Sequence, residues 1–380
     1  MSIAERLATE PVAIPRPTTT APFVRIDTFD KALTAPGGFG ARLRAARTAA
    51  LDFRREFAAT GTPDSVRTHD LISLPYPTSY GLFRAAVTPT PFLTIVNRML
   101  IVRWTETDGT ARTLLFEPSD HELDAYTPYF AELNRYAPGR LRNLFVREHT
   151  DVLSACRAAG VDPAEVDYLA FDHLHTQDVR RWLGTLRPQA DISPNAPVTA
   201  AFANARLLAQ RDELDAMADL HPLQRPWYQP ATFVDIPPEK ILPLDGSVLL
   251  GPGIALLATP GHAMGNQSLV LNTDTGIWAI SENAIAAECL VPEHSRILGL
   301  ARSARSGGHE VILNANTLET TYEQYNSLVI EKTLVDVSQQ DARFPQFFPS
   351  SELTGARLNP GTSPTFTHRA IHHGAPPATR

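Results

Sequence analysis

Two blocks of β-branched and apolar residues, separated by helical stretches, constrain the fold of this chain more than any other feature. The first block comprises residues 92–104 and 111–116, and the second comprises residues 253–258, 267–272 and 276–280. Asp108-Gly109 lies inside the first block and is a hairpin signal. Two β-rich halves with helices around them predict an α/β fold, an αββα sandwich of two mixed β-sheets flanked by helices.

Histidines follow two of the predicted strands. A short strand at 166–171 runs into His173-Leu174-His175, and the strand at 253–258 runs into Thr259-Pro260-Gly261-His262. Residues two apart in an extended segment point to one side, so both imidazoles of the first pair can bind one ion. The Pro-Gly turn directs His262 out of its sheet. Three histidine ligands with an open fourth position are typical of a catalytic zinc ion, so we predict a metal site of His173, His175 and His262.

Oxygen-bearing side chains near these histidines are candidates for further roles. Glu282 and Asn283 follow the strand at 276–280, where they would either reach the same ion or cap a helix. Asp178 lies shortly after the histidine pair and is the first candidate for the general base, with Glu282 the second. The alternative for Asp178 is a cap on the helix predicted at 179–186.

The two histidine segments carry a resemblance to a known family. The strings VDYLAFDHLHTQD and LLGPGIALLATPGHAMGNQSLVL resemble motifs of the metallo-β-lactamase superfamily, whose usual forms are H-x-H-x-D-H and T-P-G-H-T-x-G-x-x-S. The resemblance implies the metallo-β-lactamase fold, with His173, His175 and His262 at the first metal position.

The chain departs from the family at the second metal position. The usual Asp and His fall at Gln177 and Asp178, the bridging Asp falls at Asn283 beside Glu282, and residues 347–352 contain no histidine where the last ligand is usual. An amide is a poorer ligand than a carboxylate. The resemblance therefore implies an atypical member with a degenerate second metal site, in which Asp178, Glu282 and Asn283 are the remaining ligand candidates. One zinc ion is expected; a second ion is left open, and iron or manganese are alternative metals.

Three functions follow from the resemblance. The first is a metallo-hydrolase acting on a small-molecule ester, lactone, amide or thioester, because zinc lowers the pKa of bound water to about 7 and supplies hydroxide. The second is a mononuclear iron oxygenase of the persulfide dioxygenase type, with His173, His262 and Glu282 as its triad. The third is a non-catalytic binding protein, which the lost ligands favour and the three retained histidines oppose. We prefer the hydrolase.

The ends of the chain are expected to lie outside the central domain. Residues 71–355 form the predicted metallo-β-lactamase-like domain, and residues 1–70 an N-terminal extension, partly disordered, with one helix at about 38–60. Residues 356–380 form a predicted C-terminal tail that contains His368, His372 and His373. The side chains expected near the cleft are Trp227, Tyr228, Phe233, Trp278 and His294.

Composition restricts the partners. The net charge of −7 gives no electrostatic footprint for nucleic acid or an anionic membrane surface. Two cysteines are too few for a disulfide scaffold, and no stretch has the length and apolarity of a signal peptide or a membrane span. We expect a cytoplasmic protein with a small-molecule substrate and without nucleic-acid or membrane partners; nothing in the sequence indicates an oligomeric state.

Overall fold

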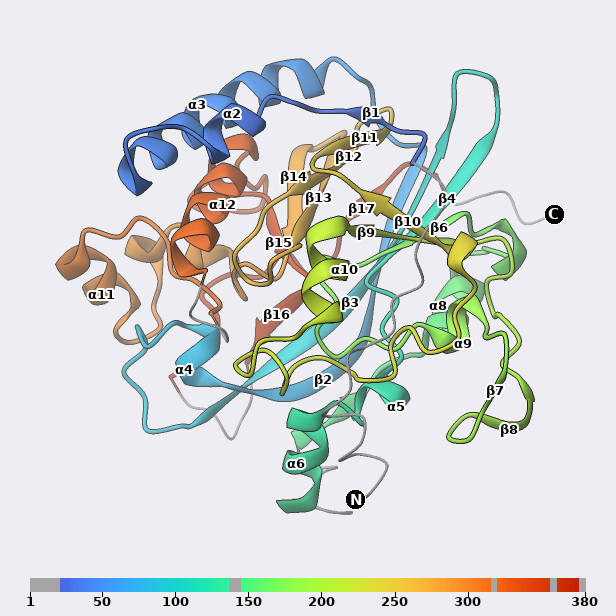
Figure 1. Cartoon of the computed structure of the whole chain (residues 1–380). Helices are drawn as coiled ribbons and strands as arrows, with labels where there is room; N and C mark the ends of the chain where they lie inside the picture. The colour runs from blue at the N-terminus through green and yellow to red at the C-terminus, as the bar shows by residue number, and fades with distance from the viewer. Residues whose placement is uncertain (1–20, 137–144, 316–319, 356–360, 376–380) are drawn as a thin grey trace.

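The computed structural model describes residues 21–136, 145–315, 320–355 and 361–375 (Figure 1). These residues form two β-sheets that face each other, with helices on both outer sides. The disordered segment predicted at the N-terminus lies almost entirely outside the described residues. The αββα sandwich of two mixed sheets is confirmed, because each of the two main sheets contains parallel and antiparallel pairs.

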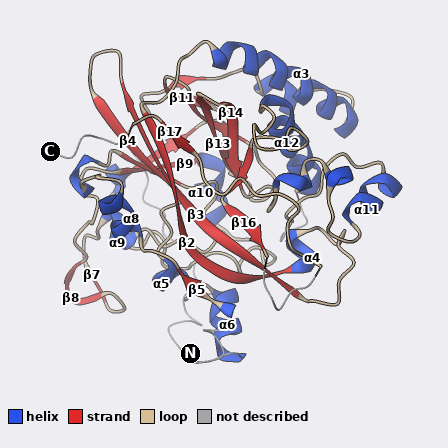
Figure 2. Ribbon diagram, turned by 180° about the vertical axis from the view of Figure 1, so that it is seen from behind, coloured by secondary structure: helices blue, strands red, loops and turns tan. Residues whose placement is uncertain are grey.

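In the described residues the larger sheet has nine strands. In chain order they are β2 (Ser65–Pro77), β3 (Phe92–Thr105), β4 (Ala111–Phe116), β5 (Arg147–Glu148), β6 (Tyr168–Ala170), β9 (Arg206–Gln210), β10 (Ile241–Leu244), β16 (Ser351–Thr354) and β17 (His372–His373). The long strands β2 and β3 are neighbours in this sheet and lie between β4 and β17 (Figure 2). The hairpin predicted from Asp108-Gly109 joins β3 to β4, and Gly109 has the positive φ of 86° that such a turn requires.

Six strands of the described part of the chain form the smaller sheet, in the order β1-β11-β12-β13-β14-β15. They are β1 (Val24–Arg25), β11 (Val248–Gly251), β12 (Ile254–Ala258), β13 (Gln267–Thr273), β14 (Gly276–Ser281) and β15 (Phe347–Pro349). The predicted second block therefore forms the antiparallel centre of this sheet. A separate hairpin joins β7 (Pro188–Gln189) to β8 (Ser193–Pro197).

Helices cover the outer faces of both sheets. Helices α3 (Phe39–Ala58) and α12 (Thr321–Leu334) share one apolar core with the smaller sheet. Helices α8 (Val152–Ala158), α9 (Arg180–Leu183) and α10 (Arg211–Ala218) share another with the larger sheet. The remaining helices of the described residues are α2 (Asp30–Leu33), α4 (Thr78–Gly81), α5 (His121–Asp124), α6 (Pro128–Tyr136) and α11 (Leu300–Gly307), with 3₁₀ turns η2 (Pro163–Glu165), η3 (Pro238–Lys240), η4 (Ala287–Cys289) and η5 (Pro292–His294).

The third apolar core lies between the two sheets. Leu100 and Leu114 of the larger sheet belong to the same buried cluster as Leu256 and Leu269 of the smaller one. Side chains alternate across each strand, so one face of each sheet fills this inner layer and the other face meets the helices. The layers hold the ends of β6, β12 and β14 in fixed relative positions.

The predicted boundaries at residues 70 and 355 do not separate independent units. Strand β2 crosses the first boundary, β1 pairs with β11, and β17 pairs with β2. The described parts of the predicted extension and tail are therefore built into the sandwich, because both sheets gain an edge strand from them. In the described part of the chain, the helices are too short or too polar to cross a membrane.

Candidate metal centre

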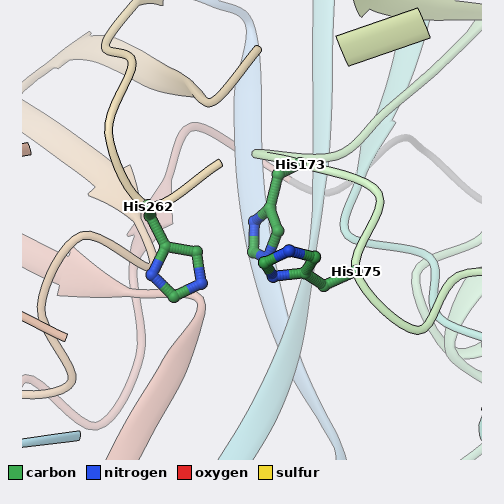
Figure 3. A group of neighbouring side chains, drawn as sticks. All are labelled: His173, His175 and His262. Carbon is green, nitrogen blue, oxygen red and sulfur yellow. The ribbon is translucent and has the colours of Figure 1, made fainter. Parts of the chain in front are cut away.

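Three histidines from two different sheets converge on one point. His173 and His175 follow β6 of the larger sheet, and His262 follows β12 of the smaller sheet. One ring nitrogen of each lies within 4.8 Å of the others, and all three side chains are buried (Figure 3). The centroids of the His173 and His262 rings are 4.5 Å apart, and those of His173 and His175 are 4.4 Å apart. The geometry suits one ion held between the two sheets.

The turn that carries His262 depends on a glycine. Gly261 has φ of 137°, and a Cβ at this position would lie only 2.1 Å from the backbone nitrogen of Gln324 in α12. A side chain at residue 261 would thus force helix and turn apart. The close approach of α12 to this turn helps to fix the position of the His262 ring.

Hydrogen bonds select the nitrogen that each of two histidines presents. Nδ1 of His262 donates to the carbonyl of Asn314 at 2.7 Å. Nδ1 of His173 donates to Oδ1 of Asp172 at 2.5 Å, and Oδ2 of Asp172 accepts from the Ser350 hydroxyl. In the neutral form of both rings Nε2 then carries the lone pair that can bind a metal. Metal-binding histidines commonly hold a carboxylate or carbonyl in this way.

Burial and charge act on the histidines in opposite directions. Burial lowers the pKa of His262 to about 3 and also lowers that of His175, with the His173 charge adding to the effect. Burial lowers the pKa of His173 as well, but the Asp172 carboxylate outweighs it and raises the value to about 9. Since metals bind the neutral imidazole, His262 and His175 are ready ligands at neutral pH, whereas His173 must release a proton on binding.

Glu282 faces the cluster and Asn283 does not. One carboxylate oxygen of Glu282 lies 3.7 Å from Nε2 of His173, and Glu282 forms a second metal-capable group with Asp172 and His173. Burial raises the pKa of Glu282 to about 7. The Asn283 amide instead donates to Glu331 at 3.0 Å, which corrects its predicted role as a ligand. The strand end was correctly located, but only one of its two side chains turns toward the histidines.

Asp178 does not reach the histidines. Both of its oxygens accept from the guanidinium of Arg180, and Oδ1 also accepts the Arg180 N–H at 3.1 Å. The carboxylate therefore pairs with Arg180, the first residue of α9, and also accepts its backbone N–H. This arrangement resembles the helix cap that was the alternative prediction for Asp178. The prediction of Asp178 as base and ligand is corrected, because a buried carboxylate is held by the nearest buried cation.

The late histidines also lie elsewhere. Nε2 of His368 donates to the Pro345 carbonyl at 2.8 Å, and His373 bonds to Asp274. His372 is exposed on the edge strand β17. None of these three residues belongs to a metal-capable group of the described chain.

A pocket opens onto the histidines from the side of β2, β3 and α6. Its lining is mostly apolar and also contains several polar side chains. The apolar lining includes Ile72, Leu74, Ile95, Phe130, Leu133, Val146 and Trp227, and the polar lining includes Glu117, Ser119, Gln177, Glu282 and Ser351. Among the aromatic residues predicted at the cleft, Trp227 lines the pocket and Tyr228 packs edge-on against His175. Phe233 and Trp278 are core residues, and His294 packs near Phe344.

Sequence reasoning missed the residues that hold the ligands. Asp172 directly precedes His173, and an acid beside a candidate ligand was a usable signal. Asn314 is far from His262 in the chain and contacts it only through a backbone carbonyl. No pattern in a single sequence marks such a residue.

Comparisons with known proteins found similarity to part of the chain. No protein-family model matches the chain. Over 127 residues, 33% of this chain, it is 28% identical to curated N-acyl homoserine lactonases of Bacillus thuringiensis, including AiiA of subspecies kurstaki. The match spans 41% of the length of those relatives.

Solved structures with a similar chain include two lactonases. One is a quorum-quenching N-acyl homoserine lactone lactonase, with 17% identity, a TM-score of 0.42, and coverage of 66% of this chain and 87% of that one. The other is AidC, a dizinc quorum-quenching lactonase, with 12% identity, a TM-score of 0.44, and coverage of 80% of this chain and 94% of that one.

The two-sheet sandwich and the histidines at its strand ends define a metallo-β-lactamase-like protein. The sequence similarity to the curated lactonases agrees with the resemblance of this chain to the metallo-β-lactamase superfamily.

Proposed function

We propose that this chain is a metal-dependent hydrolase that opens small-molecule lactones. The observation that carries the proposal is the three-histidine cluster in the lining of a largely apolar pocket. The sequence similarity to N-acyl homoserine lactonases favours a lactone over the other carbonyl substrates that the fold could accept. Esters, amides and thioesters are the alternative substrates, and the assay described below compares their rates of hydrolysis with those of lactones.

The donor set fits one zinc ion. His173, His175 and His262 would hold it, which leaves a fourth position for water or substrate. A bound zinc ion would polarise a substrate carbonyl and lower the pKa of a water molecule to about 7. Asp172 and the Asn314 carbonyl orient two of the rings, so the protein supplies the preorganised geometry.

Glu282 is the group placed to move a proton. Its carboxylate lies beside Nε2 of His173 and lines the pocket. Burial raises its pKa to about 7, so near neutral pH the carboxylate can accept a proton from an attacking water and return it to the leaving alkoxide. In a lactone the leaving alkoxide stays attached to the acyl group, and the product is a hydroxy acid.

The apolar side chains of the pocket would contact the part of the substrate next to the reacting carbonyl. Leu74 and Ile95 come from the larger sheet, Phe130 and Leu133 come from α6, and Trp227 closes the wall beside His175. A substrate with an apolar arm would bury that arm here, at about 0.8 kcal/mol for each methylene group. Within a lactone series we expect kcat/KM to rise with the length of the arm until the pocket is filled.

The test is a lactonase assay on zinc-loaded protein. Hydrolysis of γ-butyrolactones that carry short and long N-acyl arms is followed by proton release, next to matched esters and thioesters, and hydrolysis of matched amides is followed by amine formation. We expect turnover with the wild type, loss of turnover and of zinc in His262→Ala, and retained zinc with about 10²- to 10⁴-fold lower kcat in Glu282→Gln. Zinc binding without turnover of any lactone would refute the proposal and favour a binding protein.

A second candidate rests on the position of Glu282. With His173 and His262 it would make a two-histidine, one-carboxylate set, which suits non-haem iron. His175 lies in the same cluster, and three imidazoles favour zinc over this alternative. Elemental analysis of protein purified without added metal separates the two, because the oxygenase requires stoichiometric iron.

A further inference from the structure

Glu213 contacts both of the loops that carry the histidines. It lies in the first turn of α10, is 1% exposed, and is distant in sequence from both loops. Oε1 accepts the backbone N–H of Leu174 at 2.9 Å, and Oε2 accepts the backbone N–H of Gly265 at 3.0 Å. Leu174 lies between the two histidines of the first loop, and Gly265 lies three residues beyond His262. One carboxylate therefore joins the two loops.

A third donor extends this contact to His175. The hydroxyl of Tyr228 donates to Oε1 of Glu213 at 2.8 Å. The Tyr228 ring packs edge-on against the His175 ring, with centroids 4.6 Å apart, and the two residues form a β-bridge. Through Tyr228, Glu213 also supports the ring of His175.

The packing at Gly265 shows how closely α10 and the His262 turn approach. A Cβ at residue 265 would lie 2.3 Å from both the backbone nitrogen and the Cβ of Glu213. Only glycine permits this contact, so the hydrogen bond from the Gly265 N–H to the Glu213 carboxylate depends on both residues. The two loops are also joined by the N–H of Gln267, which donates to the Asp172 carbonyl at 2.7 Å.

We propose that Glu213 is a positioning residue, which sets the distance between the His173–His175 loop and the His262 turn before metal binds. The histidines come from separate sheets, so their relative position depends on contacts between the loops. A carboxylate is suited to this role because its two oxygens accept from three donors. Glutamine has the same shape but one acceptor oxygen, so its NH₂ group would face a backbone N–H. The role rests on the proposed metal function of the histidines.

The test compares two buried carboxylates. Glu288 is also fully buried and joins remote segments, since it accepts from the Ser295 hydroxyl and from the N–H of Thr365. Zinc affinity is measured by competition with a chromophoric chelator, and the cobalt-loaded protein gives the absorption spectrum of the ligand field. We expect Glu213→Gln to weaken zinc binding about 10- to 100-fold and to change the cobalt spectrum. Glu288→Gln should lower the melting temperature and leave both metal readouts unchanged.

Zinc affinity within twofold of wild type in Glu213→Gln would overturn the proposal. If Glu213→Gln does not fold, Glu213→Asp replaces it, because the shorter side chain cannot reach both N–H groups and should also weaken zinc binding. A wild type that binds no zinc would refute the proposed function instead. The role of Glu213 is then decided on metal-free protein, where amide exchange at Leu174 and Gly265 should be at least tenfold faster in the variant; unchanged exchange would overturn it.

Discussion

Glu331 is a buried carboxylate whose ionisation should limit stability at neutral pH. It lies on α12 with no exposed surface, and its Oε1 accepts from the hydroxyls of Ser268 and Ser281 and from the Asn283 amide. Burial outweighs these bonds and raises the pKa of Glu331 from 4.5 to about 7. The folded protein therefore keeps this proton at pH values where the unfolded chain has lost it.

The sign and size of the effect follow from proton linkage. The stabilisation is fully present below the unfolded pKa and is lost as pH rises through the folded pKa, so the unfolding free energy falls between about pH 4.5 and pH 7. At about 1.4 kcal/mol for each pKa unit, Glu331 contributes a loss of about 3 kcal/mol. Glu331→Gln is neutral at every pH and should lose this contribution.

Urea denaturation at pH 4.5 and pH 8 measures the difference. We expect the fall in unfolding free energy between the two pH values to be about 3 kcal/mol smaller in Glu331→Gln than in the wild type. Other buried acids, such as Glu352, contribute equally to both proteins and cancel. Glu323→Gln, on the same helix but partly exposed, is the matched control. An unchanged pH dependence in Glu331→Gln would refute the reasoning.

Three further substitutions test separate parts of the account. Asp172→Asn removes the carboxylate that orients His173 and should weaken zinc binding about 10- to 100-fold in chelator competition, and unchanged affinity would contradict this. Asp178→Asn breaks a buried pair and should lower the unfolding free energy by about 3 kcal/mol in urea without changing zinc affinity, whereas lost zinc would restore Asp178 to the site. Gly261→Ala forces a Cβ against α12 and should lower the melting temperature and the zinc affinity together, and a wild-type melting curve would contradict the packing at Gln324.

Local sequence patterns predicted the elements that carry the site. The apolar runs at β3, β4, β12, β13 and β14 are long and bounded by turn residues, so their positions follow from the chain itself. The His173–His175 pair and the Pro-Gly-His turn were visible for the same reason, since each of these segments comes shortly after a strand. That all three rings meet required the resemblance to a known family, because the pairing of sheets is not encoded locally.

The contacts that were missed join residues far apart in the chain. Asn314 holds His262, Glu213 holds two loops, and β17 pairs with β2 across most of the sequence. Asp178 was misassigned because proximity to His175 in sequence suggested a shared site, while in space the Arg180 guanidinium is its nearer partner. Side-chain direction after a strand end depends on tertiary packing, which also explains why Glu282 faces the histidines and Asn283 does not.

The most direct test of the central claim is a crystal structure of zinc-loaded protein with anomalous data at the zinc edge. The account predicts one anomalous peak, about 2.0 to 2.1 Å from a nitrogen of each of His173, His175 and His262. No peak between these three rings, or a peak held by other residues, would contradict it.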